Sequence, residues 1–149
     1  MHRRNLLKGT FTAAGALLAA ATSALRANAA DPEKSKVVYH LTDPDKVGFV
    51  LGNIRNHFDG VGGPDKVTIA LVVHGPALKA FHAAPANAEV TRRLGELSKT
   101  TLALHACGNT MKSQSITLKD LPPGFVVAEE GGVVRIAELQ AAGYVYLRP

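Results

Sequence analysis

The sequence predicts an α/β domain with three layers, in which a mostly parallel five-stranded sheet lies between helices. Short runs rich in β-branched and aromatic residues alternate along the chain with segments whose apolar residues recur every three or four positions. This order is typical of strand and helix units that build a parallel sheet. Residues 67–74 are almost continuously apolar, as expected of a central strand that helices cover on both faces.

The first predicted strand and helix occupy residues 36–58. Residues 36–41 form a short β-branched and aromatic run. Asp43 followed by Pro44 predicts a helix start with Asp43 as the capping residue. The apolar positions that follow fall on one helix face: Val47, Val50, Leu51, Ile54 and Phe58. The glycine-rich residues 59–65 come after a helix and before a strand, the wrong place for a dinucleotide-binding loop, so we expect a plain connection there.

Two helical segments are predicted between the second and third strands. Gly75 and Pro76 open the first segment, and Pro85 interrupts the chain because proline cannot continue the backbone hydrogen bonds of a helix. The apolar positions of the two segments are Leu78 and Phe81, then Val90, Leu94 and Leu97. Residues 101–107 are predicted to form the third strand, which ends at Gly108.

The last part of the chain repeats the alternation. Thr110 is predicted to cap a short helix that runs to Ser115. Residues 125–128 and 144–147 are predicted to be the fourth and fifth strands. The helix between them is closed by Gly143, and its predicted buried side consists of Val133, Ile136 and Leu139.

The first 29 residues have the order of an export signal. A basic start containing Arg3-Arg4 is followed by an alanine-rich, weakly apolar run and by the small-x-small sequence Ala27-Asn28-Ala29. The arginine pair indicates the twin-arginine route. A membrane-spanning helix needs about 20 strongly apolar residues, and Arg26 interrupts this run. Cleavage after the signal is expected to leave one periplasmic domain, residues 30–149.

The predicted mature domain is nearly neutral. The whole chain has 17 Lys and Arg against 12 Asp and Glu, but four basic residues lie in the signal: Arg3, Arg4, Lys8 and Arg26. The remaining 13 basic and 12 acidic residues give a net charge of +1. Because the basic residues are scattered, we expect no nucleic-acid partner. We also expect no membrane span in the mature form.

Cys107 is the single cysteine of the chain, so no internal disulfide can form. In an oxidising compartment an unpaired thiol is buried, bound to another molecule or reactive. Gly108 removes side-chain cover, and the turn of Gly108, Asn109 and Thr110 offers N–H groups and a positive helix end that stabilise a thiolate. Lys112 adds positive charge if it turns toward the sulfur. The alternative is that Cys107 is a small core residue.

Titratable residues recur at the predicted strand ends, where parallel sheets collect their reactive groups. They are His40, His74, His105, Cys107, Glu129 and Glu130. His105 should share the face of Cys107. His40 and His74 are either acid and base groups or histidines that bond neighbouring carbonyls. We expect Glu129 and Glu130 to be solvated turn residues, and His57 and His82 to be surface or packing residues.

Three segments resemble the DsrE/DsrF-like proteins: residues 72–75, residues 104–111 around the cysteine, and residues 132–149 at the end of the chain. The resemblance spans essentially the whole mature domain. It implies an α/β/α fold with a five-stranded parallel sheet, assembly into oligomers, and sulfur handling by one cysteine that carries a persulfide. Cys107 matches the position of that cysteine.

The leading hypothesis is therefore a periplasmic sulfur carrier without a cofactor. Cys107 would hold the persulfide, His74 or His40 would move protons, and the turn of Gly108, Asn109 and Thr110 would stabilise the outer sulfur. The expected partners are sulfur-donor and sulfur-acceptor proteins or small thiols, with a homo-oligomer as the expected assembly.

Two other classes of function remain open from the sequence. One is a metal-binding protein, because imidazole and sulfur ligands suit zinc or copper; its ligands would be His40, His74, His105 and Cys107. The other is a non-catalytic interaction subunit with an inert cysteine.

Overall fold

A five-stranded, all-parallel sheet forms the centre of the fold. The computed structural model describes residues 34–82 and 88–149. In spatial order the strands are β4 (Phe125–Ala128), β3 (Ala103–Cys107), β2 (Val67–Val73), β1 (Ser35–Leu41) and β5 (Val145–Leu147). The predicted α/β class is therefore confirmed, and the first three strands are neighbours in the sheet.

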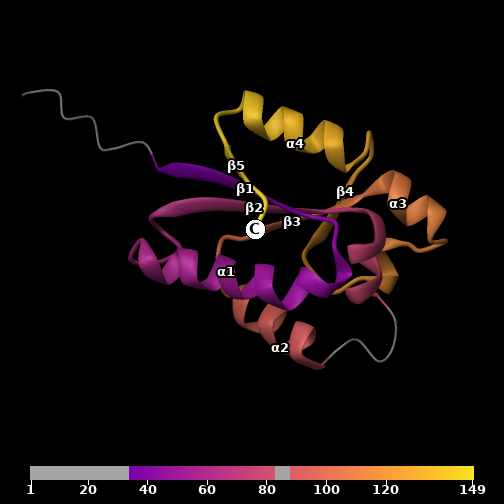
Figure 1. Ribbon diagram of the computed structural model, residues 1–149, viewed down its shortest axis with the longest axis horizontal. Helices are drawn as coiled ribbons and strands as arrows, with labels where there is room; N and C mark the ends of the chain where they lie inside the picture. Colours follow the sequence, from indigo (N-terminus) through magenta and orange to yellow (C-terminus); the bar gives the residue numbers. More distant parts are fainter. Residues whose placement is uncertain (1–33, 83–87) are drawn as a thin grey trace, which may run out of the picture. The chain divides into compact units, whose positions relative to one another are not determined.

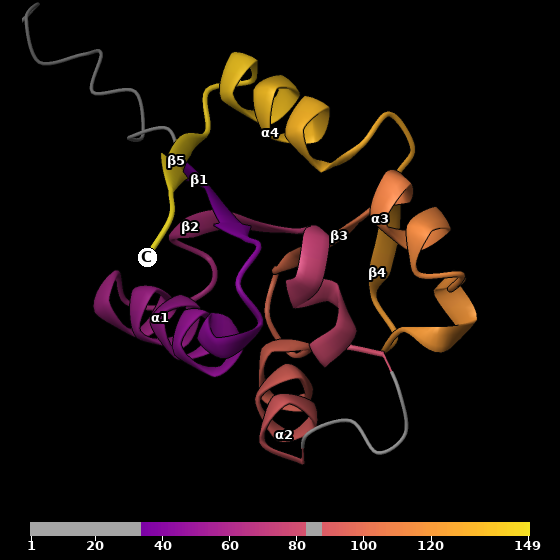
Figure 2. The same cartoon turned by 45° about the vertical axis from the view of Figure 1, so that its right-hand side comes forward.

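Helices cover the two faces of this sheet unequally (Figure 1). Helices α1 (Val47–Gly60) and α2 (Ala88–Leu97) lie on one face, and α4 (Gly132–Ala141) lies on the other. The short helix α3 (Gly108–Ser113) follows directly from the end of β3, as the turned view in Figure 2 also shows. The described residues also include the 3₁₀ helices η2 (Pro44–Lys46), η3 (Gly75–Ala80) and η4 (Leu118–Asp120).

The hydrophobic core is larger on the α1 and α2 side. The predicted apolar positions of both helices are all buried there: Val47, Val50, Leu51, Ile54, Phe58, Val90, Leu94 and Leu97. The core on the α4 side is a small cluster of Val38, Ala70, Val72, Ile136 and Leu139. Because β2 lies in the middle of the sheet, its side chains contribute to both cores, which explains its nearly continuous apolar sequence.

Several local predictions were wrong. Asp43 precedes η2 without making a side-chain cap. The short helix predicted to open at Gly75 is present, as the 3₁₀ helix η3. Thr110 lies inside α3, whose capping position belongs to Cys107. Val133 is 67% exposed, because α4 begins at Gly132 and its buried face is Gly132, Ile136 and Leu139.

Other predictions are confirmed or lie outside the described part. Gly143 ends α4 with a backbone hydrogen bond to Gln140, and the Tyr144 N–H bonds back to Leu139. The export signal and the predicted break at Pro85 lie outside the described residues. Across the part of the chain that the structure describes, no helix combines the length and apolarity needed to cross a membrane.

Candidate functional site

Strand register gathers the predicted site residues on the α4 face of the sheet. His40 pairs with Val72, and Val72 pairs with His105, so both histidines point to the side on which Val72 packs against α4. Val73 pairs with Ala106, which makes His74 and Cys107, the next residues along their strands, neighbours at the carboxyl edge. The site therefore lies where parallel sheets carry their reactive groups.

Cys107 lies at the junction of β3 and α3 and is 6% exposed. Burial by itself raises the pKa of its thiol, but four hydrogen bonds to the sulfur outweigh it and lower the pKa below its usual value. The donors are the hydroxyl of Thr110 and the backbone N–H groups of Thr110, Gly132 and Asn109. These donors favour the thiolate because each stabilises the charged form of the group that it contacts.

The Thr110 hydroxyl makes two contacts that fix its orientation. Its oxygen accepts the backbone N–H of Gly75 at 2.9 Å. A hydroxyl has one proton, and with the oxygen engaged by Gly75 that proton is free to donate to the sulfur of Cys107. Through these two hydrogen bonds, Thr110 connects the backbone that follows β2 with the thiol at the end of β3.

Two consecutive glycines allow the start of α4 to approach the cysteine. A Cβ at Gly132 would lie 3.2 Å from both the Cβ and the Cδ2 of His74, and 3.3 Å from the Cβ of Cys107. Gly131 has φ +104°, and a Cβ there would lie 2.8 Å from the Nδ2 of Asn109 and 4.0 Å from the Cys107 sulfur. A side chain at Gly132 would crowd His74 and Cys107, and the positive φ of Gly131 favours glycine there.

His40 and His74 form a directly bonded pair. Their Nε2 atoms are 2.6 Å apart, and the rings stack with a centroid distance of 4.7 Å. The Nδ1 of His40 is 2.7 Å from the hydroxyl of Tyr146 on β5. Burial, His74 and Arg148 lower the pKa of His40 from 6.5 to about 4. Burial and Arg148 also lower the pKa of His74, so both imidazoles are neutral near pH 7.

A neutral histidine pair can share only one proton between the two Nε2 atoms. If His40 donates, its bare Nδ1 accepts from the Tyr146 hydroxyl; if His74 donates, the Nδ1–H of His40 donates to the Tyr146 oxygen. Tyr146, His40 and His74 thus form one hydrogen-bonded row, in which a change of donor in one bond changes the donor in the other. A Cβ built on Gly132 would lie 3.2 Å from His74 and 3.3 Å from the Cβ of Cys107, so the row ends close to Cys107.

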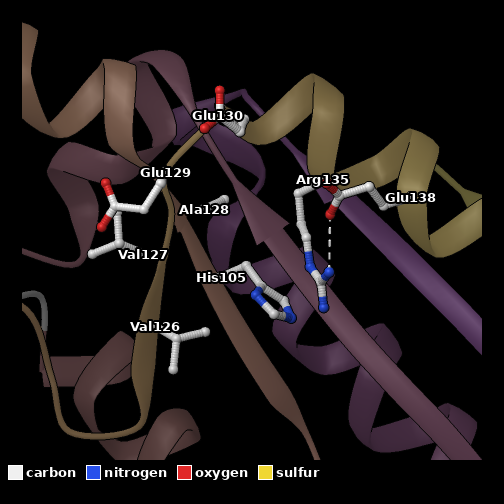
Figure 3. A pocket seen from close by; sticks show the side chains of 9 residues that line it. His105, Val126, Val127, Ala128, Glu129, Glu130, Arg135 and Glu138 are labelled. Carbon is white, nitrogen blue, oxygen red and sulfur yellow. Dashed lines mark hydrogen bonds and ion pairs between the residues drawn. The ribbon is translucent and has the colours of Figure 1, made fainter.

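His105 lies deeper on the same face, as predicted, and is 8% exposed. It lines a pocket with Arg135 and Glu138 of α4 instead of joining the other two histidines (Figure 3). Burial and the Arg135 guanidinium lower the pKa of His105, and Glu138 partly opposes them. His105 is therefore also neutral near pH 7.

The remaining predicted residues have simpler positions. Glu129 and Glu130 are exposed, as expected, and Lys112 is exposed and does not belong to the donors that reach the sulfur. Gly108 packs closely against β4, where a Cβ would lie 3.0 Å from the Ala128 carbonyl oxygen.

Two histidines predicted as surface or packing residues have hydrogen-bond partners. His57 bonds the hydroxyl of Tyr39 at 2.9 Å, and His82 bonds the side chain of Gln114 at 2.9 Å.

Sequence reasoning missed Tyr146, Gly131 and Gly132 as parts of the site. The double glycine between a strand and a helix was the one available signal, because adjacent glycines often mark a close approach of backbone to another group. The metal hypothesis gains no support, since residues 34–82 and 88–149 contain no cluster of three or more His, Cys, Asp or Glu side chains able to hold a metal ion.

The fold and the site together define an α/β/α protein with a hydrogen-bonded cysteine at the carboxyl edge of a parallel sheet. No protein-family model and no curated protein matches the chain. Among solved structures, the chain is similar to MTH1491, a protein of unknown function from Methanobacterium thermoautotrophicum. The two have 26% sequence identity and a TM-score of 0.66, over 77% of this chain and 99% of that chain. This similarity supports the fold, so the chemistry has to be argued from the site.

Proposed function

We propose that this protein is a sulfur carrier of the DsrE/DsrF-like kind, which holds a persulfide on Cys107 and passes the outer sulfur to a partner. The observation that carries the proposal is the set of four hydrogen bonds that lower the pKa of the Cys107 thiol despite its burial. A buried cysteine with a purely structural role needs no such donors.

The chemistry requires only thiolate and persulfide exchange. The Cys107 thiolate attacks the outer sulfur of a donor persulfide, a new S–S bond forms, and the donor's S–S bond breaks so that the donor leaves as a thiolate. An acceptor thiolate then attacks the outer sulfur held on Cys107, and Cys107 leaves as a thiolate. No oxidant, metal or cofactor takes part in either step.

The donors around Cys107 fit the charges of both steps. The N–H groups of Asn109, Thr110 and Gly132 converge on the sulfur, where the negative charge lies before loading and after release. We infer that the neutral pair of His74 and His40 accepts a hydrogen bond from an incoming thiol or persulfide and shifts its protons along the bonds to Tyr146 without becoming charged, because burial and Arg148 disfavour the imidazolium form.

The low exposure of Cys107 favours a small sulfur donor, or a partner protein whose cysteine can come into contact with the carboxyl edge of the sheet. Only 6% of the Cys107 residue is exposed, so a reaction partner has little room to approach it. A slender group such as a free persulfide or an extended cysteine side chain meets this requirement. The proposed donors and acceptors are accordingly small thiols or partner proteins with an exposed cysteine, and the proposed compartment is the periplasm.

Sulfur loading can be measured directly because the chain has one cysteine. The purified protein is treated with an inorganic polysulfide and weighed intact, with Cys107→Ser as the control variant. We expect an adduct of one sulfur atom on the wild type, removed by a reducing agent, and no adduct on Cys107→Ser. An unmodified wild type, or an adduct that survives in Cys107→Ser, would contradict the proposal.

A further inference from the structure

A small pocket beside β4 has no role in the proposed sulfur chemistry. Its volume is about 250 Å³, below the roughly 300–1,000 Å³ of sites for drug-sized ligands. The side chain of His105 projects from the sheet and that of Arg135 projects from α4, and the guanidinium lies beside the imidazole (Figure 3). Val126 and Ala128 of β4 supply the apolar side chains of the wall, whereas the side chain of Val127 packs against the core on the other face of the sheet.

The pocket exists because α4 leaves one edge of the sheet uncovered. Helix α4 packs against β1, β2, β3 and β5. Strand β4 forms the opposite edge, and its residue Val126 is 50% exposed. A ligand can therefore enter from the β4 side without displacing any helix.

Arg135 has an unused hydrogen-bonding edge in this pocket. Its Nη1 donates to the carboxylate of Glu138 at 3.0 Å. Within residues 34–82 and 88–149, its Nε is the only buried side-chain nitrogen or oxygen without a hydrogen-bond partner. An unsatisfied buried donor is costly, and more so when it is charged. The free edge, made of Nε and Nη2, is the fork that binds two oxygens of a planar or tetrahedral anion.

The other charged groups of the pocket leave this edge available to an anion. Glu138 is already paired with Arg135. Glu129 and Glu130 are exposed, and Figure 3 shows their side chains directed away from His105 and Arg135. The neutral His105 supplies an N–H donor without adding a charge that would repel Arg135.

We propose that this pocket binds a small oxyanion, a carboxylate or a sulfur oxyanion, through the Nε and Nη2 edge of Arg135 with His105 as a second donor. On binding, the anion supplies the acceptor that the buried Nε–H lacks. Cys107 does not line this pocket, although Gly131 borders both the pocket and the cysteine, and anion binding requires no sulfur on the thiol.

Titration of the ¹⁵N-labelled full chain tests the site, with the Arg135 Nε–H signal and the neighbouring amides as the readout. Sodium thiosulfate and sodium acetate are titrated in turn, at an ionic strength held constant with sodium chloride. We expect saturable shifts with at least one of the two anions. The anion that binds more tightly identifies the class. Arg135→Gln should weaken binding by more than about tenfold, because it removes a charged fork.

The controls separate this site from general charge effects and from the sulfur chemistry. Arg55→Gln removes an exposed arginine of α1 that is paired with Asp59, and it should leave binding unchanged. Cys107→Ser should also bind normally, so a failure of sulfur loading does not affect this result. The proposal is overturned if neither anion shifts the Arg135 signal, or if Arg135→Gln, with its amide spectrum otherwise intact, binds as tightly as the wild type.

Discussion

At the scale of single residues, Thr110 links the two strands that build the candidate site. Its hydroxyl accepts from the Gly75 N–H after β2 and donates to the sulfur of Cys107 after β3. A residue that looks like a helix cap in the sequence thus serves as a hydrogen-bond bridge. Replacing it should alter thiol reactivity and local stability together.

Thr110→Val should raise the pKa of the Cys107 thiol, because the variant lacks the hydroxyl donor. The rate of iodoacetamide alkylation, followed by mass spectrometry against pH, should then rise at a higher pH than in the wild type. The free energy of unfolding should fall by about 1 kcal/mol, since the Gly75 N–H loses its acceptor. Thr110→Ser keeps the hydroxyl and should behave as the wild type. Identical pH profiles for Thr110→Val and wild type would show that the hydroxyl does not act on the thiol.

His40 should make the fold less stable in mild acid. Its pKa is about 4 in the folded state against an ordinary 6.5, so between these values the unfolded chain binds more protons than the folded one. The stabilising effect of neutral His40 is complete above pH 6.5, and it is lost as the pH falls toward 4. Because the ring is partly exposed, we expect a loss of about 1 kcal/mol. Urea unfolding at several pH values should show a shallower slope for His40→Gln, and an unchanged slope would refute this assignment.

At the scale of elements, the start of α4 controls the geometry of the site. Gly131 and Gly132 bring a helix N-terminus to within hydrogen-bonding distance of the cysteine, while the side of Gly132 touches His74. The helix therefore contributes an N–H donor to the sulfur and closes one side of the histidine pair. A side chain at this position should disturb both.

Gly132→Ala tests this close approach. Alanine gains at most about 1 kcal/mol of helix propensity, whereas overpacking against His74 and Cys107 costs about 1–3 kcal/mol, so we expect a net loss of stability. Histidine ring signals in an NMR spectrum should report a changed His40 and His74 pair. The matched control is Gly95→Ala in α2, where a Cβ meets nothing within 4 Å; it should stabilise the fold by a few tenths to about 1 kcal/mol. Equal stabilisation by both substitutions would exclude a packing constraint at Gly132.

At the scale of the whole fold, most of the hydrophobic core lies on one face of the sheet and the candidate site lies on the other. The α1 and α2 face holds most of the core, and the α4 face holds a small core, the cysteine, the histidine pair and the small pocket. Because α4 is, within the described residues, the one helix on its face of the sheet, it leaves parts of that face open, and polar groups lie there. The same substitution should therefore cost different amounts on the two faces.

Ile54→Ala and Ile136→Ala compare the two cores with identical chemistry. Ile54 is fully buried in the large core, and Ile136 is 7% exposed in the small one. Deletion of buried isoleucine methyl groups costs about 2–5 kcal/mol. We expect about 4 kcal/mol for Ile54→Ala and about 2 kcal/mol for Ile136→Ala, both within that range. Chemical denaturation measures both values, and equal losses would contradict the unequal division of the core.

Sequence periodicity determined much of this fold. The apolar positions of α1 and α2 repeat every three or four residues, and the structure buries all of them, because a helix fixes which side chains share a face. The five strands and their alternation with helices were predicted in the same way. The Cys107 turn, with His40 and His74 at neighbouring strand ends, followed from the rule that parallel strands finish at one edge.

Only the tertiary structure decided which groups meet. The role of Thr110, the pairing of His40 with His74 and Tyr146, and the association of His105 with Arg135 all depend on contacts between elements far apart in the sequence. Periodicity describes one element at a time, so it cannot place a hydroxyl of α3 against a backbone N–H that follows β2. The exposure of Val133 has the same cause: Gly132 and Val133 both lie one turn before Ile136, and only packing against the sheet decides that Gly132 faces inward. The sequence by itself thus determined the elements and the edge at which chemistry is placed, and the packing of those elements determined the hydrogen bonds that act on Cys107.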